Sequence, residues 1–364
     1  MTLTYAPPAG PHAVGVCDGE VDAGGRRIMV RVWYPSVPTD TAPRPYLVGD
    51  EIQILRWYVE ASGRVPEAWV TELAAMPTHS VQDAEPASGT FGTVLFSHGA
   101  TSHVSQNTVL MEHLASHGSV VWSIAHPGQA AGVRYLDGTF ARMDAEFFTS
   151  VQSLATNSAF LTVLFGDDAA RCDAAPGLLD DALLGPWQRL WIEDTLAVLD
   201  AIEDSTVIGP PAPIVTACDL DDVAAVGMSF GGATAASVAH RDPRFRVAVN
   251  LDGGHFLSDL HDTDIRVPLT YVIGDLAGSM KARGLDITTR DVNEHFYGTQ
   301  AVRIPLAGVV HTELTDLAIV PRADRADVLS GGGNVDSQEL LDTINNIVLQ
   351  ALANSTEPVA KARP

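Results

Sequence analysis

Short apolar runs and amphipathic stretches alternate along most of the chain. The short runs are rich in β-branched residues and apolar on both faces, a pattern typical of buried parallel strands. The pattern predicts strands over residues 26–35, 92–99, 119–127, 223–229, 245–252, 267–275 and 301–308.

Helical periodicity appears between these runs. Residues 105–118 end on Gly118, a common helix stop, and residues 187–204 and 340–351 each carry one apolar face. The Pro-rich stretch 207–222 is predicted to be a loop. Alternating strands and helices predict an α/β fold with a mostly parallel sheet of about eight strands and helices on both faces.

Length and composition favour one large domain. The 364 residues would permit two or three domains. However, no linker, charge block or repeat divides them, so residues 1–364 are expected to form one domain with an insertion. Acidic residues outnumber basic ones 45 to 22, for a net charge of −23. Such a surface repels phosphate backbones and anionic bilayers, which argues against nucleic acid as a partner.

The cysteines and the ends of the chain add little chemistry. Cys17, Cys172 and Cys218 are too few and too far apart for a disulfide framework or a metal signature. The first residues lack the basic and apolar regions of a secretion signal, and no apolar run reaches the roughly 20 residues of a membrane span. We therefore expect a cytoplasmic protein without stable membrane insertion.

The stretch "VAAVGMSFGGATAASVAH" (223–240) carries the strongest functional signal. It places G-x-S-x-G between an apolar strand and a helix of small residues, which is the context of the nucleophile elbow of α/β-hydrolases. The sharp turn would raise the Ser229 hydroxyl above the sheet edge. Side chains at positions 227 and 231 would collide with neighbouring backbone, which explains both glycines.

A serine nucleophile needs a base and an acid that orients the base, in the order Ser, Asp or Glu, His. Two acids follow Ser229 at strand ends, Asp252 and Asp275, and the pattern alone leaves both open. Of the later histidines, His311 follows a strand and a short Gly-containing loop, as the last strand of this fold requires. His255 is expected to lie in a loop near the pocket.

An oxyanion hole needs two backbone N–H groups. One belongs to the residue after the nucleophile, Phe230. The other comes from a loop after an early strand, and "TVLFSHGATSH" fits with Ala100 as the donor. We expect His98, in the same loop, to be a structural hydrogen-bonding residue.

Residues 136–186 are expected to form a cap that overhangs Ser229. A helical stripe of apolar residues runs from Phe140 to Leu154. Two interpretations stay open: these residues pack on the sheet, or one face lines a substrate pocket with Phe147, Phe148 and His255.

Several motifs together resemble the platelet-activating factor acetylhydrolase family, the plasma and type II intracellular serine esterases and their bacterial relatives. They are "RVWYPS" (31–36), "LFSHGA" (95–100), "HLASHGSVVWSIAHP" (113–127), "DLDDVAAVGMSFGGAT" (219–234), "DPRFRVAVNLDGGHF" (242–256) and "VVHTELTDLA" (309–318).

The resemblance implies an acid directly after the strand that follows the nucleophile, which selects Asp252 over Asp275. It also implies His311 as the base and Ala100 and Phe230 as oxyanion donors. The chain departs from the pattern at Gly253-Gly254-His255, where relatives often carry an aromatic and a large apolar residue, and over residues 136–186.

These observations predict a serine ester hydrolase that works through an acyl-enzyme on small-molecule, short-acyl or small lipophilic esters, without a metal or organic cofactor. The same residues would serve a lactone, polyester or thioester hydrolase, or an acyltransferase or cyclase. A non-catalytic binding module on the same fold is the alternative from another class.

Overall fold

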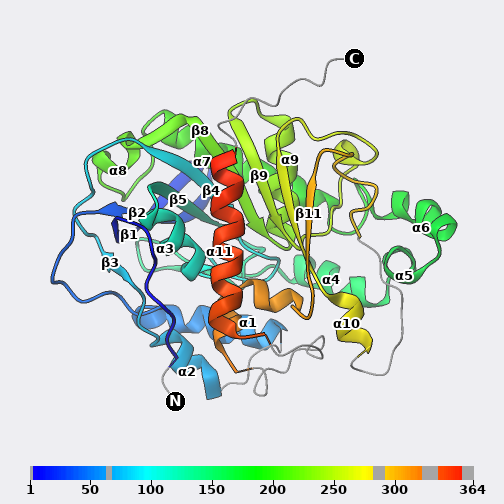
Figure 1. Cartoon of the computed structure of the whole chain (residues 1–364), viewed down its shortest axis with the longest axis horizontal. Coiled ribbons are helices and arrows are strands. Elements are labelled where there is room, and N and C mark those ends of the chain that lie inside the picture. Colours follow the sequence, from blue (N-terminus) through cyan, green and yellow to red (C-terminus); the bar gives the residue numbers. More distant parts are fainter. Residues whose placement is uncertain (1–2, 63–67, 282–291, 322–334, 355–364) are drawn as a thin grey trace.

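A nine-stranded sheet forms the centre of the computed structural model, which describes residues 3–62, 68–281, 292–321 and 335–354 (Figure 1). The strand order is β11-β10-β9-β8-β4-β5-β2-β1-β3. The strands are β1 (Ala13–Ala23), β2 (Arg26–Ser36), β3 (Ser80–Gln82), β4 (Phe91–Ser97), β5 (Ser119–Ala125), β8 (Cys218–Met228), β9 (Phe245–Leu251), β10 (Leu269–Gly274) and β11 (Val302–Leu306).

The pairing from β5 to β11 is parallel throughout, whereas β2 pairs antiparallel with both β5 and β1. The prediction of a mostly parallel α/β sheet is therefore confirmed. The sequence did not predict β1, which contains two glycines and three acidic residues instead of an apolar run. Gly15 is needed there, since a Cβ atom would lie 2.4 Å from the Tyr34 ring.

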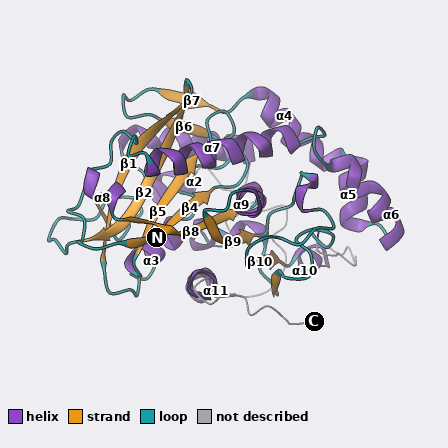
Figure 2. Cartoon of the chain, turned by 90° about the horizontal axis from the view of Figure 1, so that it is seen from above, coloured by secondary structure: helices purple, strands orange, loops and turns teal. Residues whose placement is uncertain are grey.

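Helices cover both faces of the sheet, as predicted (Figure 2). One face carries α1 (Ile52–Ser62), α2 (Ala68–Ala74), α3 (Thr108–Ser116) and α11 (Ser337–Asn354). The opposite face carries α7 (Gly185–Glu203), α8 (Ala212–Thr216) and α9 (Phe230–Arg241). The loop predicted over 207–222 is wrong in part, because it contains α8 and the first residues of β8. A short helix α10 (Leu276–Lys281) follows β10.

Residues 136–186 form a run of short elements beside the sheet. Phe140 belongs to a small hairpin, β6 (Gly132–Arg134) with β7 (Phe140–Arg142), so the helical stripe predicted from Phe140 begins too early. Figure 2 shows the helices that follow extending outward from the sheet. They are α4 (Ala145–Ser153), α5 (Ser158–Phe165) and α6 (Asp168–Ala174), with short 3-10 helices η2 (Leu154–Thr156) and η3 (Ala175–Leu178).

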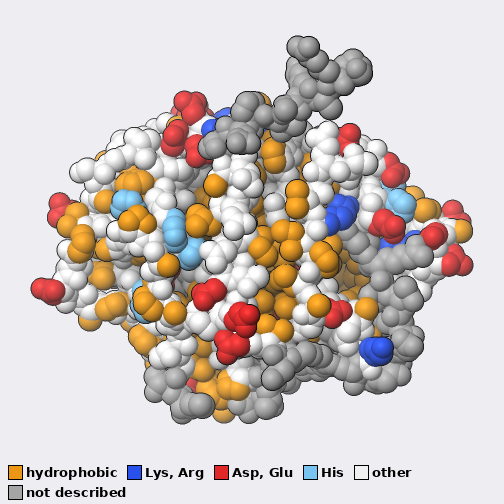
Figure 3. All heavy atoms as spheres, viewed as in Figure 1, with side chains coloured by type: hydrophobic (Ala, Val, Ile, Leu, Met, Phe, Trp, Pro, Cys, Tyr) orange, Lys and Arg blue, Asp and Glu red, His pale blue; other side chains and the backbone are white. Residues whose placement is uncertain are grey.

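The face that carries α11 agrees with the excess of acidic over basic residues in the sequence (Figure 3). On the face that carries α11, acidic and apolar side chains are both exposed and basic side chains are few (Figure 3). Among the described residues, no helix is long and apolar enough to cross a bilayer.

A buried cluster of charges joins the antiparallel end of the sheet to the loops beneath it. The Arg31 guanidinium on β2 is 2% exposed and donates to Asp18 at 2.6 and 2.9 Å. It also donates to Glu51, in the short helix η1 (Gly49–Glu51), and to the Ser105 hydroxyl at 2.8 Å. Glu51 accepts a further ion pair from Arg44 at 3.0 Å. Every charge in this cluster therefore faces a partner, which is what burial requires.

Removing Arg31 should leave the buried carboxylates of this cluster without the cation that stabilises them. We expect Arg31→Met to lower the free energy of unfolding by about 3–5 kcal/mol, because the Asp18 and Glu51 carboxylates lose their cation. The matched control is Arg134→Met, whose ion pair with Asp50 lies at the surface and contributes about 1 kcal/mol or less. Urea-induced unfolding measures both losses. Equal losses in the two variants would contradict the role given to the Arg31 cluster.

Candidate active site

Ser229 lies on the turn between β8 and α9. Its backbone has φ 55° and ψ −124°, a conformation that residues other than glycine rarely adopt. Such strain persists where the surrounding structure enforces it, and it concentrates at functional sites. The Ser229 amide donates to the Leu251 carbonyl at 2.8 Å, which ties the turn to the end of β9.

The glycines around Ser229 are required by contact between backbones. A Cβ atom at Gly227 would lie 2.1 Å from the Gly231 carbonyl oxygen, and one at Gly231 would lie 2.1 Å from the Ser97 carbonyl oxygen. The predicted reason for both glycines is therefore confirmed. The start of α9 lies directly against the end of β4, where the segment Ser97–Ala100 begins.

His311 lies between Ser229 and Asp252. Its Nε2 atom is 3.0 Å from the Ser229 Oγ atom, and its Nδ1 atom is 2.7 Å from the Asp252 Oδ2 atom. A carboxylate only accepts, so the Nδ1 atom carries the proton and Nε2 is left to accept from the Ser229 hydroxyl. The His311 side chain is 24% exposed, so solvent reaches the site.

Asp252 is held by the ends of two strands. Its backbone adopts a positive φ of 57°, and its amide donates to the Val272 carbonyl at 2.8 Å. Its Oδ1 atom accepts from the Gly274 amide at 2.8 Å, which leaves Oδ2 for His311.

Asp275, the other candidate acid, makes different contacts. Its two carboxylate oxygens accept from the amides of Gly278 at 2.7 Å and Gly308 at 2.8 Å. These bonds fix the first turn of α10 and the loop after β11.

The loop that carries His311 is anchored to the start of α3. His311 begins a 3-10 helix, η5 (His311–Leu314), and Asp316 begins the next, η6 (Asp316–Ile319). The Asp316 carboxylate accepts from the Thr108 amide at 2.6 Å, and the Asp316 amide donates to the Gln106 carbonyl at 3.1 Å. Burial raises the pKa of Asp316 well above its usual range, although these amide bonds oppose the shift.

Gln106 also holds the segment that carries Ala100. Its Oε1 atom accepts from the Gly99 amide at 2.7 Å. A Cβ atom at Gly99 would lie 3.2 Å from the Ser229 Cβ atom, so this backbone passes close to the serine. Within the described part of the chain, the amides of Ala100 and Phe230 donate no hydrogen bond.

A buried polar cluster supports the same segment from below. Asp194 on α7 pairs with Arg26 at 2.7 Å and with His126 at 2.9 Å, and the other nitrogen of His126 lies 3.1 Å from the Ser97 hydroxyl oxygen. Burial lowers the pKa of His126. Burial raises the pKa of Asp194, but the bonds from His126 and Arg26 outweigh it and lower that pKa overall.

His98 adjoins this cluster. It is fully buried, and its Nδ1 atom donates to the Gly99 carbonyl at 2.7 Å. Burial also lowers the pKa of His98, so its ring is neutral and shapes the loop by hydrogen bonding.

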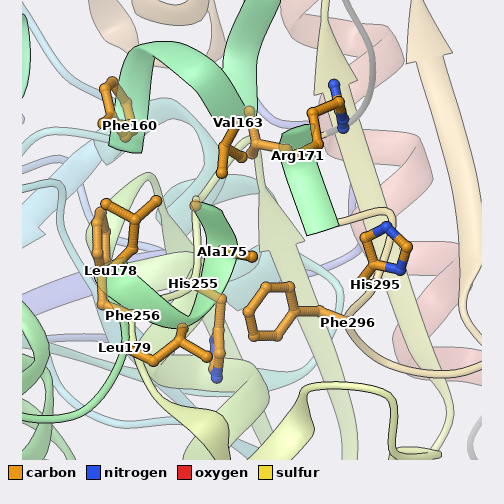
Figure 4. Close-up of a pocket in the computed structure, with 12 residues that line it drawn as sticks. Phe160, Val163, Arg171, Ala175, Leu178, Leu179, His255, Phe256, His295 and Phe296 are labelled. Carbon is orange, nitrogen blue, oxygen red and sulfur yellow. The ribbon is translucent and has the colours of Figure 1, made fainter. Parts of the chain in front are cut away.

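A cavity lies beside the site, between the elements α5, α6 and η3 and the loops that follow β9 and precede β11 (Figure 4). The space within it, including open solvent at its mouth, is about 510 Å³. His255 lines it and is buried, with Asp259 at 3.0 Å. Phe147 and Phe148 do not line it. Phe147 is fully buried and packs against the rings of Trp187 and Phe230.

The sequence did not single out three polar residues near the site. They are Gln106, Asp194 and Asn250, whose side chain bonds the Gly253 amide at 2.7 Å and so shapes the turn after Asp252. Of these, Asn250 could have been found from the sequence, because it is a lone amide side chain inside the apolar run "FRVAVNL".

Among the described residues, no cluster of three or more His, Cys, Asp or Glu side chains is arranged to hold a metal ion.

Relatives of known name cover nearly all of the chain. A platelet-activating factor acetylhydrolase of Cavia porcellus is 24% identical over 94% of this chain and 76% of its own length. One of Gallus gallus is 22% identical over 96% of this chain and 83% of its own length. Among solved structures, a ferulic acid esterase from Streptomyces cinnamoneus has a TM-score of 0.69 at 21% identity, covering 100% of this chain and 97% of that one.

The family model described as platelet-activating factor acetylhydrolase, isoform II, matches residues 3–155 and 214–359. The elbow serine, the acid after β9 and the histidine after β11 all fall inside the matched parts. The chain therefore belongs to the platelet-activating factor acetylhydrolase isoform II family and is a carboxylic ester hydrolase of the α/β-hydrolase type.

Proposed function

We propose that the chain hydrolyses carboxylic esters through an acyl-enzyme formed on Ser229. The observation that carries the proposal is the chain of hydrogen bonds from the Ser229 hydroxyl through His311 to Asp252, at 3.0 and 2.7 Å. A serine hydroxyl is a weak nucleophile until a neighbouring base accepts its proton, and this geometry supplies the base and the acid that orients it.

In the first step, the Ser229 oxygen attacks the ester carbonyl carbon while His311 Nε2 takes the hydroxyl proton. The Asp252 carboxylate holds the Nδ1 proton and stabilises the imidazolium that forms. His311 then gives its proton to the oxygen of the leaving alcohol as the C–O bond breaks, and the acyl group remains on Ser229.

The negative charge on the carbonyl oxygen needs donors that are already in place. The amides of Phe230 and Ala100 suit this role, because neither donates within the described residues. Phe230 directly follows Ser229, and Ala100 follows Gly99, whose backbone passes close to Ser229. The N-terminus of α9 adds a favourable dipole. A fixed donor of this kind is worth roughly 3–4 kcal/mol of transition-state stabilisation.

Water completes the cycle by attacking the acyl-enzyme, with His311 as the base. The His311 side chain is partly exposed, so water can reach the acyl-enzyme. This favours water over another acyl acceptor as the second nucleophile. The same residues would also open lactones, polyesters or thioesters. An acyltransferase or a cyclase fits the solvent-accessible site less well, because each must exclude water. A non-catalytic binding module would have no need of the hydrogen bonds that join Ser229, His311 and Asp252.

The family and the relatives favour small lipophilic esters as substrates. The relatives of Cavia porcellus and Gallus gallus are platelet-activating factor acetylhydrolases, and the structural neighbour is a ferulic acid esterase. We therefore propose a small-molecule carboxylic ester with an apolar portion as the substrate.

Replacing the nucleophile tests the proposal directly. We expect Ser229→Ala to lower kcat for a p-nitrophenyl ester by on the order of 10⁶-fold. A fluorophosphonate probe should label the wild-type chain once, at Ser229, and should not label the variant. Ser123→Ala, which removes a buried hydroxyl on β5, is the matched control and should still be labelled. Activity of Ser229→Ala within tenfold of wild type would overturn the proposal.

The acid is tested by comparing two strand-end aspartates. We expect Asp252→Asn to lower kcat by about 10⁴-fold, because an amide at this position favours the wrong tautomer of His311. Asp275→Asn should cost far less activity, since the Asp275 carboxylate accepts from the amides of Gly278 and Gly308, whereas His311 bonds Asp252. Steady-state kinetics of both variants would decide, and a larger loss in Asp275→Asn would assign the acid to the other strand.

A further inference from the structure

We propose that the cavity beneath α5, α6 and η3 binds the acyl group of the ester and selects medium-length or branched apolar acyl groups over acetyl. This inference rests on the proposed function, because it needs Ser229 as the acylated residue. It goes beyond the proposed function by assigning the acyl group of the ester to the side chains that line this cavity.

The cavity has two walls of different origin. One wall comes from Phe160, Val163, Ala175 and Leu178, which lie on α5 and η3. These residues fall in the segment 156–213, which the family model does not match. The other wall comes from the loops after β9 and before β11, which the model does match. We therefore expect selectivity at this cavity to differ among members of the family.

The walls present apolar surface to the space between them. Figure 4 shows Phe160 and Val163 on one side and His255 and Phe296 on the other. Two of the polar groups at the wall have partners in the protein: His255 bonds Asp259 at 3.0 Å, and the Arg171 Nη2 atom pairs with Glu294 at 3.4 Å. The rest of the wall is mostly apolar and suits an apolar ligand group.

The cavity begins two residues from the proposed acid. Gly253 packs against the serine, since a Cβ atom there would lie 1.9 Å from the Ser229 carbonyl oxygen. Gly254, the next residue, lines the cavity and has no side chain to close it off. Phe256 also lines it, and its ring centroid is 6.0 Å from that of Phe230, the residue after the nucleophile.

The position of His311 indicates which half of the ester enters. His311 reaches Ser229 from the face of the sheet covered by α3 and α11, where Leu314 and Leu317 join the core. The cavity lies on the opposite face, where His255 contacts Ser237 on α9 and Gln188 on α7. The leaving alcohol must lie near His311 to receive its proton, so the acyl group points the other way, toward the cavity.

The apolar walls argue against acetyl as the preferred group. Acetyl carries a single methyl beyond its carbonyl carbon, so it would contact little of the wall formed by Phe160, Val163, Ala175 and Leu178, whereas a longer acyl chain would contact more of it. Each methylene that leaves water for this surface should raise kcat/KM by about fourfold. We therefore expect kcat/KM of the wild-type chain to rise from p-nitrophenyl acetate through the butyrate to the hexanoate.

Filling the cavity tests the assignment. Ala175→Leu places a larger side chain on the wall and should lower the ratio of kcat/KM for hexanoate over acetate by on the order of tenfold. Ala169→Leu, on the exposed side of α6, is the matched control and should leave that ratio unchanged. Phe160→Ala enlarges the space and should shift the preference toward longer acyl groups. This second variant tests the assignment independently if Ala175→Leu fails to fold.

A second substrate series separates the acyl group from the alcohol. Butyrate esters of alcohols of increasing size should keep the same relative kcat/KM in Ala175→Leu as in the wild type, and fluorophosphonate labelling of Ser229 should stay within twofold. An unchanged acyl ratio in both cavity variants, or a change confined to the alcohol series, would overturn the inference. If the wild-type chain neither hydrolyses these esters nor reacts with the probe, the proposed function itself fails.

Discussion

The contact between the start of α9 and the end of β4 is the constraint on which the site depends. Gly231 packs so closely on the Ser97 carbonyl that no side chain fits between them. The same contact holds Ser229 in its strained conformation and brings the segment with Ala100 beside it. This one contact therefore sets the positions of the proposed nucleophile and of both proposed oxyanion donors.

Other polar groups extend this constraint outward. Gln106 bonds two parts of the site: its side chain accepts from the Gly99 amide, and its backbone carbonyl accepts from the Asp316 amide in the loop after His311. Asp194 and His126 hold Ser97 from within the core. The proposed base and the proposed oxyanion segment are thus held relative to one another by Gln106, which precedes α3, and by Asp194 on α7.

The sequence predicted the parts of the fold and site that local pattern determines. The parallel strands were apparent because both of their faces are buried, and Ser229, His311 and two candidate acids followed from motif and chain order. β1 was missed because its glycines and acidic residues are explained only by packing against Tyr34 and Arg31. Asp194 could not be found, because its partner His126 is 68 residues away in sequence. The role of the apolar residues in 136–186 was also undetermined, since only the tertiary structure separates core residues such as Phe147 from cavity residues such as Val163.

Acid quenching during turnover of an activated ester tests the central claim most directly. If Ser229 forms an acyl-enzyme, an ester that acylates faster than it deacylates should give a burst of about one alcohol per chain. Peptide mapping by mass spectrometry should then find the acyl group on the peptide that contains Ser229. Linear alcohol release from the first turnover, with the acyl group absent from Ser229 or bound to another residue, would contradict the account.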